Sequence, residues 1–222
     1  FPVLSPVSGL LFCLRPISLN MSSLVDHPDR NVIRVQLGQN TVLQGITAAQ
    51  TAELEALLVI VDCHKGDSLL EQGVHEMEQY FILEGILKRV VTNQAGKEMI
   101  LRFADERDME TSYAAWRLGT PTPYSTVCVT KVRVAKLALV DWASFLARHD
   151  SIKQSFEYSV MRLMSEIMAH TITLHLLDAP GRVKRFLRKQ PELFERIPKK
   201  ELASYLNLSA ETLSRLKQRG KI

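Results

Sequence analysis

Four polar side chains near the C-terminus have the types and spacing needed to read the edges of DNA bases. These candidate base-reading residues are Ser209, Glu211, Ser214 and Arg215. In a helical projection they lie opposite Leu213 and Leu216, so we expect them to be exposed while the leucines are buried. Arginine can bond the two major-groove acceptors of guanine, glutamate can accept from cytosine, and serine can serve several base edges or a phosphate.

Basic residues surround this face, and the charge of the chain is concentrated there. Residues 181–222 hold twelve Lys and Arg against four Asp and Glu, a local +8 that leaves −4 for residues 1–180. This asymmetry predicts a small module for a polyanion on an acidic body, with a merely solvated basic face as the alternative. Phosphate contacts would set affinity and register without reading sequence. The candidate phosphate contacts are Lys199, Lys200, Lys217, Arg219 and Lys221.

Two short helices are predicted to carry these residues. KKELASYL forms the first, Asn207 can adopt the left-handed conformation of a tight break, and Ser209 is a suitable N-cap for the second. Glu211 then lies in the positive first turn. This pattern predicts a helix-turn-helix whose second helix enters the major groove by its N-terminal end. The apolar positions that support it are Leu202, Leu206, Leu208, Leu213 and Leu216, with the small Ala203 where the helices would cross.

The region from residue 59 to about residue 139 has the character of a β-domain. Short runs rich in Val, Ile, Phe and Tyr alternate with glycines, and N-x-x-G forms the tightest turn, which favours an antiparallel β-sandwich or small barrel. The alternating run at residues 126–139 predicts one further half-buried strand. Residues 47–58 precede this region and predict a helix that begins at Thr47.

A long helix is predicted at residues 151–177, with two apolar stripes. We interpret the first as a coiled-coil seam that packs against a second copy, and it comprises Phe156, Val160, Leu163, Ile167, His170, Leu174 and Leu177. The second stripe would pack against the β-domain, and it comprises Met161, Met164, Met168, Thr171 and His175. A helix buried within its own monomer is the competing interpretation. Residues 178–181 (DAPG) should end the helix and form a hinge.

Composition narrows the class of protein. With 46% hydrophobic and 23% charged residues, the chain resembles a globular protein, and no run approaches the ~20 apolar residues of a membrane span. Cys13, Cys63 and Cys128 are odd in number and far apart, so neither a disulfide framework nor a thiolate metal site is indicated, and a reducing cytoplasm fits best. Nucleophile elbow, H-E-x-x-H and Walker motifs are all absent from the sequence, which argues against an enzyme.

The first twenty residues make a poor signal peptide because they lack a basic start and their apolar run is short. Met21 opens a more ordinary polar sequence. We therefore expect Met21 to be the natural start and residues 1–22 to be a disordered extension.

The motifs together resemble the CRP/FNR family of bacterial transcription regulators. KGDSLLEQG and QYFILEGILKRVVTNQAGKEMILRFA are similar to its β-roll, and ELASYLNLSAETLSRL is similar to its DNA-binding module. The resemblance implies an α+β fold with an antiparallel, cyclic-nucleotide-binding-like β-roll over residues 23–150. It further implies a dimerisation helix at 151–178 and a helix-turn-helix at 179–222. A homodimer on double-stranded DNA follows, and RNA polymerase is a further partner that the family allows.

The recognition helix resembles one branch of that family. Glu211, Ser214 and Arg215 match the E-x-x-S-R pattern of the FNR branch, which implies a half-site near TTGAT. The family usually continues into a β-hairpin wing that this sequence lacks, so the module is either wingless or truncated. In a wingless module, the tail KQRGKI would take over phosphate contacts.

The effector is less clear from the sequence. Cyclic-nucleotide binders of the family carry G-E-x-A-L followed by P-R-S/T-A, whose Arg pairs with the phosphate. Aligned on that cassette, the candidate effector pocket comprises Thr111, Ser112, Tyr124 and Ser125, with Tyr124 in place of the Arg. The missing Arg argues against cAMP, and three scattered cysteines argue against an iron–sulfur cluster. A haem could use Cys63 with a histidine, but a lone His is more often a solvated or core residue. Among the histidines, His170 stands out because on a dimer seam it would charge below neutral pH.

The leading hypothesis is thus a homodimeric transcription regulator that reads a palindrome. The alternative is a cyclic-nucleotide-type sensor module whose basic tail docks on a protein partner and binds DNA without sequence preference.

Overall fold

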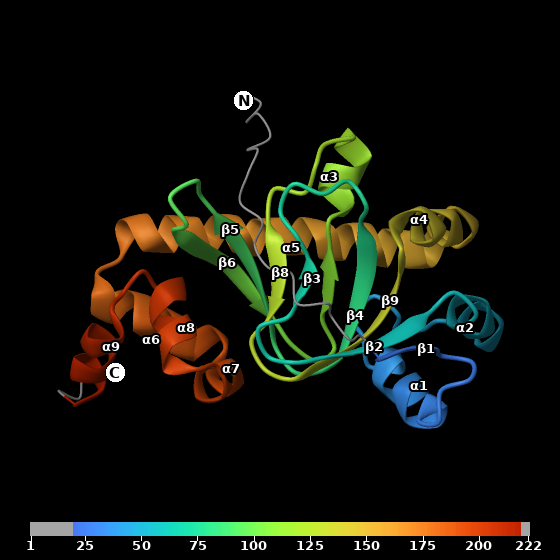
Figure 1. The fold of residues 1–222 in the computed structure, drawn as a ribbon, viewed down its shortest axis with the longest axis horizontal. Helices are drawn as coiled ribbons and strands as arrows, with labels where there is room; N and C mark the ends of the chain where they lie inside the picture. The colour runs from blue at the N-terminus through green and yellow to red at the C-terminus, as the bar shows by residue number, and fades with distance from the viewer. Residues whose placement is uncertain (1–19, 219–222) are drawn as a thin grey trace.

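The computed structural model describes residues 20–218, whose strands form two antiparallel sheets (Figure 1). One sheet has the order β1-β2-β9-β4-β7 and the other β3-β8-β5-β6. The strands are β1 (Asn20–Ser23), β2 (Val59–Cys63), β3 (Ser68–Leu70), β4 (Glu78–Glu84), β5 (Leu87–Thr92), β6 (Glu98–Ala104), β7 (Met109–Thr111), β8 (Ser125–Cys128) and β9 (Val132–Ala138). The predicted α+β class with an antiparallel β-domain is confirmed.

Helices precede and follow most of the strands of this β-domain in the sequence. They are α1 (Arg30–Gly38), α2 (Ala48–Glu55), α3 (Tyr113–Leu118), α4 (Leu139–Arg148), α5 (Asp150–Leu176), α6 (Ala179–Lys189), α7 (Pro191–Arg196), α8 (Lys199–Tyr205) and α9 (Ala210–Gln218). Figure 1 shows α5 running behind the sheets, with α4 near its start and α6 to α9 gathered near its end. The long helix therefore connects the β-domain to the C-terminal helices.

Side chains from both sheets fill the space between them. Val61, Tyr80 and Val134 come from the five-stranded sheet, while Leu87 and Cys128 come from the four-stranded one, and all are buried in one cluster. Alternation along each strand sends every second side chain inward. A second cluster packs α1, α2, α4 and the start of α5 on the outside of the five-stranded sheet.

Local signals in the sequence set several of these elements. Thr47 begins α2 through a reciprocal capping box with Gln50, as the pattern predicted, although the helix ends at Glu55. The N-x-x-G turn is also confirmed: Gly96 N donates to Asn93 O at 2.9 Å and joins β5 to β6. Short-range hydrogen bonds therefore fix both features.

The single strand predicted at residues 126–139 is wrong, because the chain there forms two strands in different sheets. Between β8 and β9, Val129 N donates to Ile86 O at 2.8 Å, so the chain crosses from one sheet to the other. The crossing passes so close to Gly85 that an added Cβ would lie 2.2 Å from Lys131 O, and Gly85 has φ +90°. Only glycine fits this approach.

The extension predicted at residues 1–22 is wrong for its last three residues. Asn20, Met21 and Ser22 belong to β1 and pair with Asp62, Val61 and Ile60, which completes an edge of the sheet. Residues 1–19, and with them Cys13, lie outside the described residues. Met21 as the natural start stays a prediction.

The long helix ends just before Asp178, as the DAPG pattern predicted, and Asp178 then caps the next helix, while the predicted hinge stays a prediction. Asp178 Oδ1 accepts from Gly181 N at 2.9 Å, and Pro180 lies in the first turn of α6. The chain therefore changes direction between α5 and α6 over only a few residues. The proposed domain limits at residues 150 and 178 remain predictions.

Candidate nucleic-acid interface and sensor region

Helices α8 and α9 form a helix-turn-helix around a left-handed residue. Asn207 has φ +51°, as predicted, and Leu208 N donates to Ala203 O at 2.8 Å across the turn. Ser209 begins α9, because its Oγ accepts from Thr212 N at 3.0 Å. The turn and the cap together fix the angle at which α9 leaves α8.

One face of α9 is buried and the other is exposed, as the helical projection predicted. Leu213 and Leu216 pack in an apolar cluster with Leu202, Ala203 and Leu206 of α8. The four candidate base-reading residues, Ser209, Glu211, Ser214 and Arg215, are all exposed. Their assignment to bases remains a proposal.

The candidate phosphate contacts lie beside that face where the structure describes them. Lys199, Lys200 and Lys217 are exposed, and Lys199 and Lys217 border a small cavity of about 100 Å³ together with Ser214. The structure thus brings α8 and α9 cations together around a base-reading candidate. Arg219 and Lys221 lie outside the described residues.

The helix-turn-helix is attached to the four-stranded sheet by apolar and ionic contacts. Lys88 Nζ lies 2.9 Å from Glu201 Oε2 of α8, and Arg196 of α7 donates to Glu106 at 2.7 and 2.8 Å. Phe103 of β6 packs on Tyr205 of α8, with ring centroids 5.1 Å apart. These contacts join residues about a hundred positions apart, so the sequence carried no local signal for them.

The stripe predicted as a dimer seam on α5 is not a continuous exposed surface, because two of its residues are buried within their own chain; its contact with a second copy stays a prediction. Phe156 is fully buried and stacks edge-on against Trp142, and Leu163 is buried as well. Of the remaining members, Val160, Ile167, His170 and Leu174 are partly exposed and Leu177 is exposed. The methionine stripe expected to face the β-domain is the exposed one: Met161, Met164 and Met168 are each about half exposed or more. The methionine stripe is thus the more exposed of the two, the reverse of what the prediction requires.

His170 also differs from the prediction. Its ring stacks on Tyr205 with centroids 3.7 Å apart and planes 3° from parallel. Burial lowers the pKa of His170 to about 4; hydrogen bonding with the Tyr205 backbone opposes this shift and the Arg185 charge favours it. The imidazole therefore stays neutral below the pH at which an exposed histidine charges.

The four candidate effector residues come together between the sheets. Thr111, Ser112, Tyr124 and Ser125 are all buried. Tyr124 Oη donates to Thr111 O at 2.8 Å, and Ser112 Oγ lies 3.2 Å from Thr122 Oγ1. Burial raises the pKa of Tyr124, so the phenol keeps the proton that it donates. The region is already hydrogen-bonded within the chain.

A buried ion cluster completes this sensor region, and the sequence reasoning missed it. Arg89 is 3% exposed and Glu110 2% exposed, and Arg89 Nε donates to Glu110 Oε1 at 2.6 Å. Arg102 donates to the other oxygen of Glu110 at 3.0 Å and also pairs with Asp108. The Arg89 guanidinium lies 3.9 Å from the centre of the Tyr124 ring. Tyr124 itself is the residue that aligns with the arginine of the family motif. The signal available in the sequence was the presence of two adjacent basic residues, Lys88 and Arg89, within the otherwise apolar strand LKRVVT.

Within residues 20–218, His, Cys, Asp and Glu side chains form no group of three that could hold a metal ion. In the same part of the chain, no helix is long and apolar enough to cross a membrane.

Comparisons with known proteins agree with this arrangement of β-domain, long helix and helix-turn-helix. The cyclic nucleotide-binding domain family matches residues 60–149. The cAMP-activated global transcriptional regulators CRP of Salmonella typhimurium and Klebsiella aerogenes are each 23% identical over 176 residues, which cover 73% of this chain and 84% of those proteins. Residues 60–149 are therefore a cyclic nucleotide-binding domain, and the chain as a whole is similar to transcription regulators of the CRP/FNR family.

Solved structures share the fold at lower identity. FixK2 from Bradyrhizobium japonicum superimposes with a TM-score of 0.62 at 15% identity, covering 72% of this chain and 85% of that one. The c-di-GMP responsive global regulator CLP from Xanthomonas campestris gives 0.65 at 13% identity, covering 78% and 93%. The CRP/FNR resemblance in the sequence is thus confirmed, and the neighbours are regulators rather than enzymes.

Proposed function

We propose that this protein is a homodimer that binds a DNA palindrome with FNR-like half-sites through α9, under control of an effector acting on the β-roll. The observation that carries the proposal is the two-sided character of α9. Its apolar face is buried against α8, while Glu211, Ser214 and Arg215 project from a capped, exposed N-terminal half. A recognition helix enters the major groove by that end.

The chemistry of this face suits direct readout of bases. The Arg215 guanidinium extends from α9, and its Nη2 has one weak contact, 3.4 Å from Thr212 Oγ1. It can turn to the O6 and N7 acceptors of a guanine. Lys199 and Lys217 border the same small cavity as Ser214 and suit phosphate contacts near it.

An exposed apolar stripe on α5 supports the homodimer. Its members recur every three or four residues and lie outside the cores of the chain; they are Tyr158, Met161, Met164, Met168, Ile172 and Leu176. Such a stripe is costly in water, and a second copy of the same helix would cover it. A two-fold axis along α5 would place two recognition helices on successive major grooves, ~34 Å apart.

Fluorescence anisotropy with a palindromic TTGAT-type probe and a scrambled probe tests DNA reading. We expect the wild-type protein to prefer the palindrome. Arg215→Ala should weaken that binding by about 1–3 kcal/mol and remove the preference. Lys217→Ala is the matched control, because loss of a phosphate contact should lower affinity for both probes equally. Equal, salt-dependent binding of the wild type to both probes would contradict sequence-specific reading.

Sedimentation velocity tests the dimer independently of DNA. We expect Met161→Lys combined with Met168→Lys to convert a dimer into a monomer, because two charges would be buried at the centre of the contact. Val140→Lys is the control, since Val140 is a similarly exposed apolar residue on α4. A dimer that persists in the double variant at the wild-type concentration would rule out this face.

A further inference from the structure

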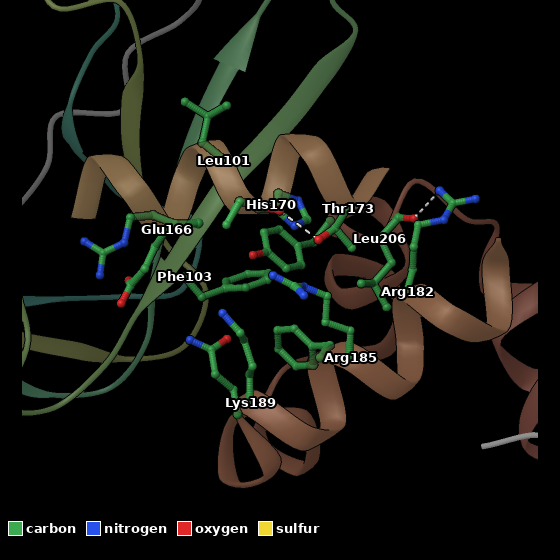
Figure 2. Close-up of a pocket in the computed structure, with 14 residues that line it drawn as sticks. Leu101, Phe103, Glu166, His170, Thr173, Arg182, Arg185, Lys189 and Leu206 are labelled. Carbon is green, nitrogen blue, oxygen red and sulfur yellow. Dashed lines mark hydrogen bonds between the residues drawn. The ribbon is translucent and has the colours of Figure 1, made fainter. Parts of the chain in front are cut away.

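A cavity lies where the sensor sheet, the long helix and the DNA-binding helices meet. It has a volume of about 190 Å³, and β6, α5, α6 and the end of α8 contribute its walls. Figure 2 shows Arg185 and Lys189 reaching from α6 toward Phe103, with His170 and Glu166 of α5 on the opposite side. Arg102, which belongs to the ion cluster near Tyr124, also borders this cavity.

Aromatic rings make one wall of this cavity rigid. Tyr205 stacks on His170, contacts Phe103 with centroids 5.1 Å apart, and meets Phe186 edge-on at 5.6 Å. Because Tyr205 contacts rings from three other elements, its position depends on all of them. The wall is therefore preformed, as binding sites for small molecules usually are.

The charge around the cavity is positive and poorly balanced. Among residues 20–218, neither Arg182, Arg185 nor Lys189 has a carboxylate partner within 4.0 Å, and Glu166 is the acid that borders the space. Arg102 also lines it but is neutralised by Asp108 and Glu110. The cations without acidic partners on α6 thus outnumber the acid on α5.

Two buried nitrogens at this cavity also lack hydrogen-bond partners. Arg182 donates through Nη1 to Leu206 O at 2.8 Å, yet its Nε has no partner among the described residues. His170 Nε2 likewise has none. Buried polar atoms are nearly always satisfied by protein, water or ligand. The Nε of Arg182, a guanidinium donor beside Arg185 and Lys189, is chemically complementary to an oxygen anion.

We propose that this cavity binds a small oxyanion, held chiefly by Arg185 and Lys189 against the Phe103–Tyr205 wall. Its size limits the ligand to roughly one phosphate or one single-ring carboxylate, since a cavity of ~150 Å³ accommodates benzene. A free or esterified phosphate and a small carboxylic acid share this chemistry. The ligand would touch β6, α5, α6 and α8 at once and so fix the helix-turn-helix relative to the β-roll. That consequence for DNA rests on the proposed function, whereas binding of the anion does not.

Isothermal titration calorimetry of the full chain in a chloride buffer, without DNA, tests the site with inorganic phosphate and with benzoate. We expect one site per chain for at least one probe, and a loss of affinity of about tenfold or more in Arg185→Gln. Arg188→Gln is the matched control, because Arg188 is an exposed cation of the same helix outside the cavity, and it should change affinity by less than about twofold. Binding of phosphate alone would support a phosphate ligand, and tighter binding of benzoate would support a carboxylate.

Absence of binding by both probes would overturn the proposal, and so would equal weakening by Arg185→Gln and Arg188→Gln, which would indicate diffuse surface charge. Circular dichroism checks the fold of each variant, and Lys189→Gln replaces Arg185→Gln if that variant is unfolded. Anisotropy with the palindromic probe, with and without the anion, then reports on coupling. If DNA is not read at all while the anion still binds with the expected variant pattern, the proposed function fails and the site stands.

Discussion

The candidate sensor region around Tyr124 and the helix α9 use the same kinds of side chain in opposite ways. Around Tyr124, the charged groups Arg89, Glu110 and Arg102 are buried, and with Asp108 their charges balance. On α9, Glu211 and Arg215 are exposed, and neither has an ion-pair partner within 4.0 Å among residues 20–218. Charged side chains that form ion pairs within the protein hold the structure in one arrangement, whereas exposed charged side chains without an ion-pair partner remain available to bind another molecule.

This difference has a consequence for the β-roll. The Arg89 guanidinium occupies the face of Tyr124, where the family motif would present an arginine to a ligand phosphate. Thr111 O accepts hydrogen bonds from both Arg89 Nη2 at 3.0 Å and Tyr124 Oη at 2.8 Å. One carbonyl therefore satisfies a donor of each side chain. A ligand that entered here would have to displace these internal bonds.

The largest expected effect comes from opening the sensor cluster. We expect Arg89→Ala to lower the free energy of unfolding by about 3–5 kcal/mol, because it leaves Glu110 partly uncompensated in the interior. Urea unfolding monitored by circular dichroism measures the change. Arg215→Ala is the matched control: the same atoms are removed from an exposed site, so stability should stay within about 0.5 kcal/mol. Similar losses in both variants would remove the contrast between the two regions.

Replacing the charged pair sharpens the same test. Arg89→Met combined with Glu110→Leu should recover much of the stability lost in Arg89→Ala, because apolar groups of similar volume need no partner. A double variant as unstable as the single one would mean that the cluster contributes by packing on Tyr124 rather than by neutralising charge.

Sequence patterns predicted the features that depend on neighbours a few residues away. The start of α2 at Thr47 and the left-handed Asn207 followed from residue types at fixed positions. The orientation of α5 did not, because both of its stripes are apolar enough to be buried. Which one turns inward is decided by Trp142 and Tyr205, which lie outside the helix. Long-range packing overrides a local pattern when that pattern is symmetric.

The same limit explains the other errors. The run at residues 126–139 alternates like one strand, whereas the crossing between sheets packs closely on Gly85 in the turn between β4 and β5. Arg89 and Glu110 are 21 residues apart and belong to different sheets. The exposed residues of α9 were easier to find, because a site made by one short helix is encoded by one short stretch of sequence.

An intermediate effect is expected for His170, whose environment lies between the two extremes. Its pKa is about 4 in the folded protein and 6.5 ordinarily, so the unfolded chain takes up the proton first as the pH falls. The contribution of the neutral His170 to the free energy of unfolding is therefore fully present above pH 6.5 and is lost as the pH falls toward 4. The ring is partly exposed, so we expect a loss of about 1–2 kcal/mol rather than the full value.

Urea unfolding at a series of pH values between about 7 and 5 measures this loss. His170→Phe should retain the stacking on Tyr205 and give a flatter profile, while His75→Gln, at an exposed histidine, serves as the control. The charged groups nearest His170 along the cavity wall are Glu166, Arg185 and Arg102. An unchanged profile in His170→Phe would assign the acid sensitivity to those groups instead.

The smallest expected effect concerns Ser209, the one base-reading candidate whose hydroxyl also caps its own helix. Because Thr212 N donates to Ser209 Oγ at 3.0 Å, Ser209→Ala should lower stability by about 1 kcal/mol, whereas Ser209→Asp should retain the cap. Ser204→Ala, at an exposed position on α8, is the control and should stay within about 0.5 kcal/mol in urea unfolding. If Ser209→Ala leaves stability unchanged but weakens binding to the palindrome, the hydroxyl acts, like Glu211 and Arg215, as an exposed group that contacts DNA. If it lowers stability and leaves the preference for the palindrome intact, Ser209 belongs with the internally satisfied groups, and reading falls to Glu211, Ser214 and Arg215.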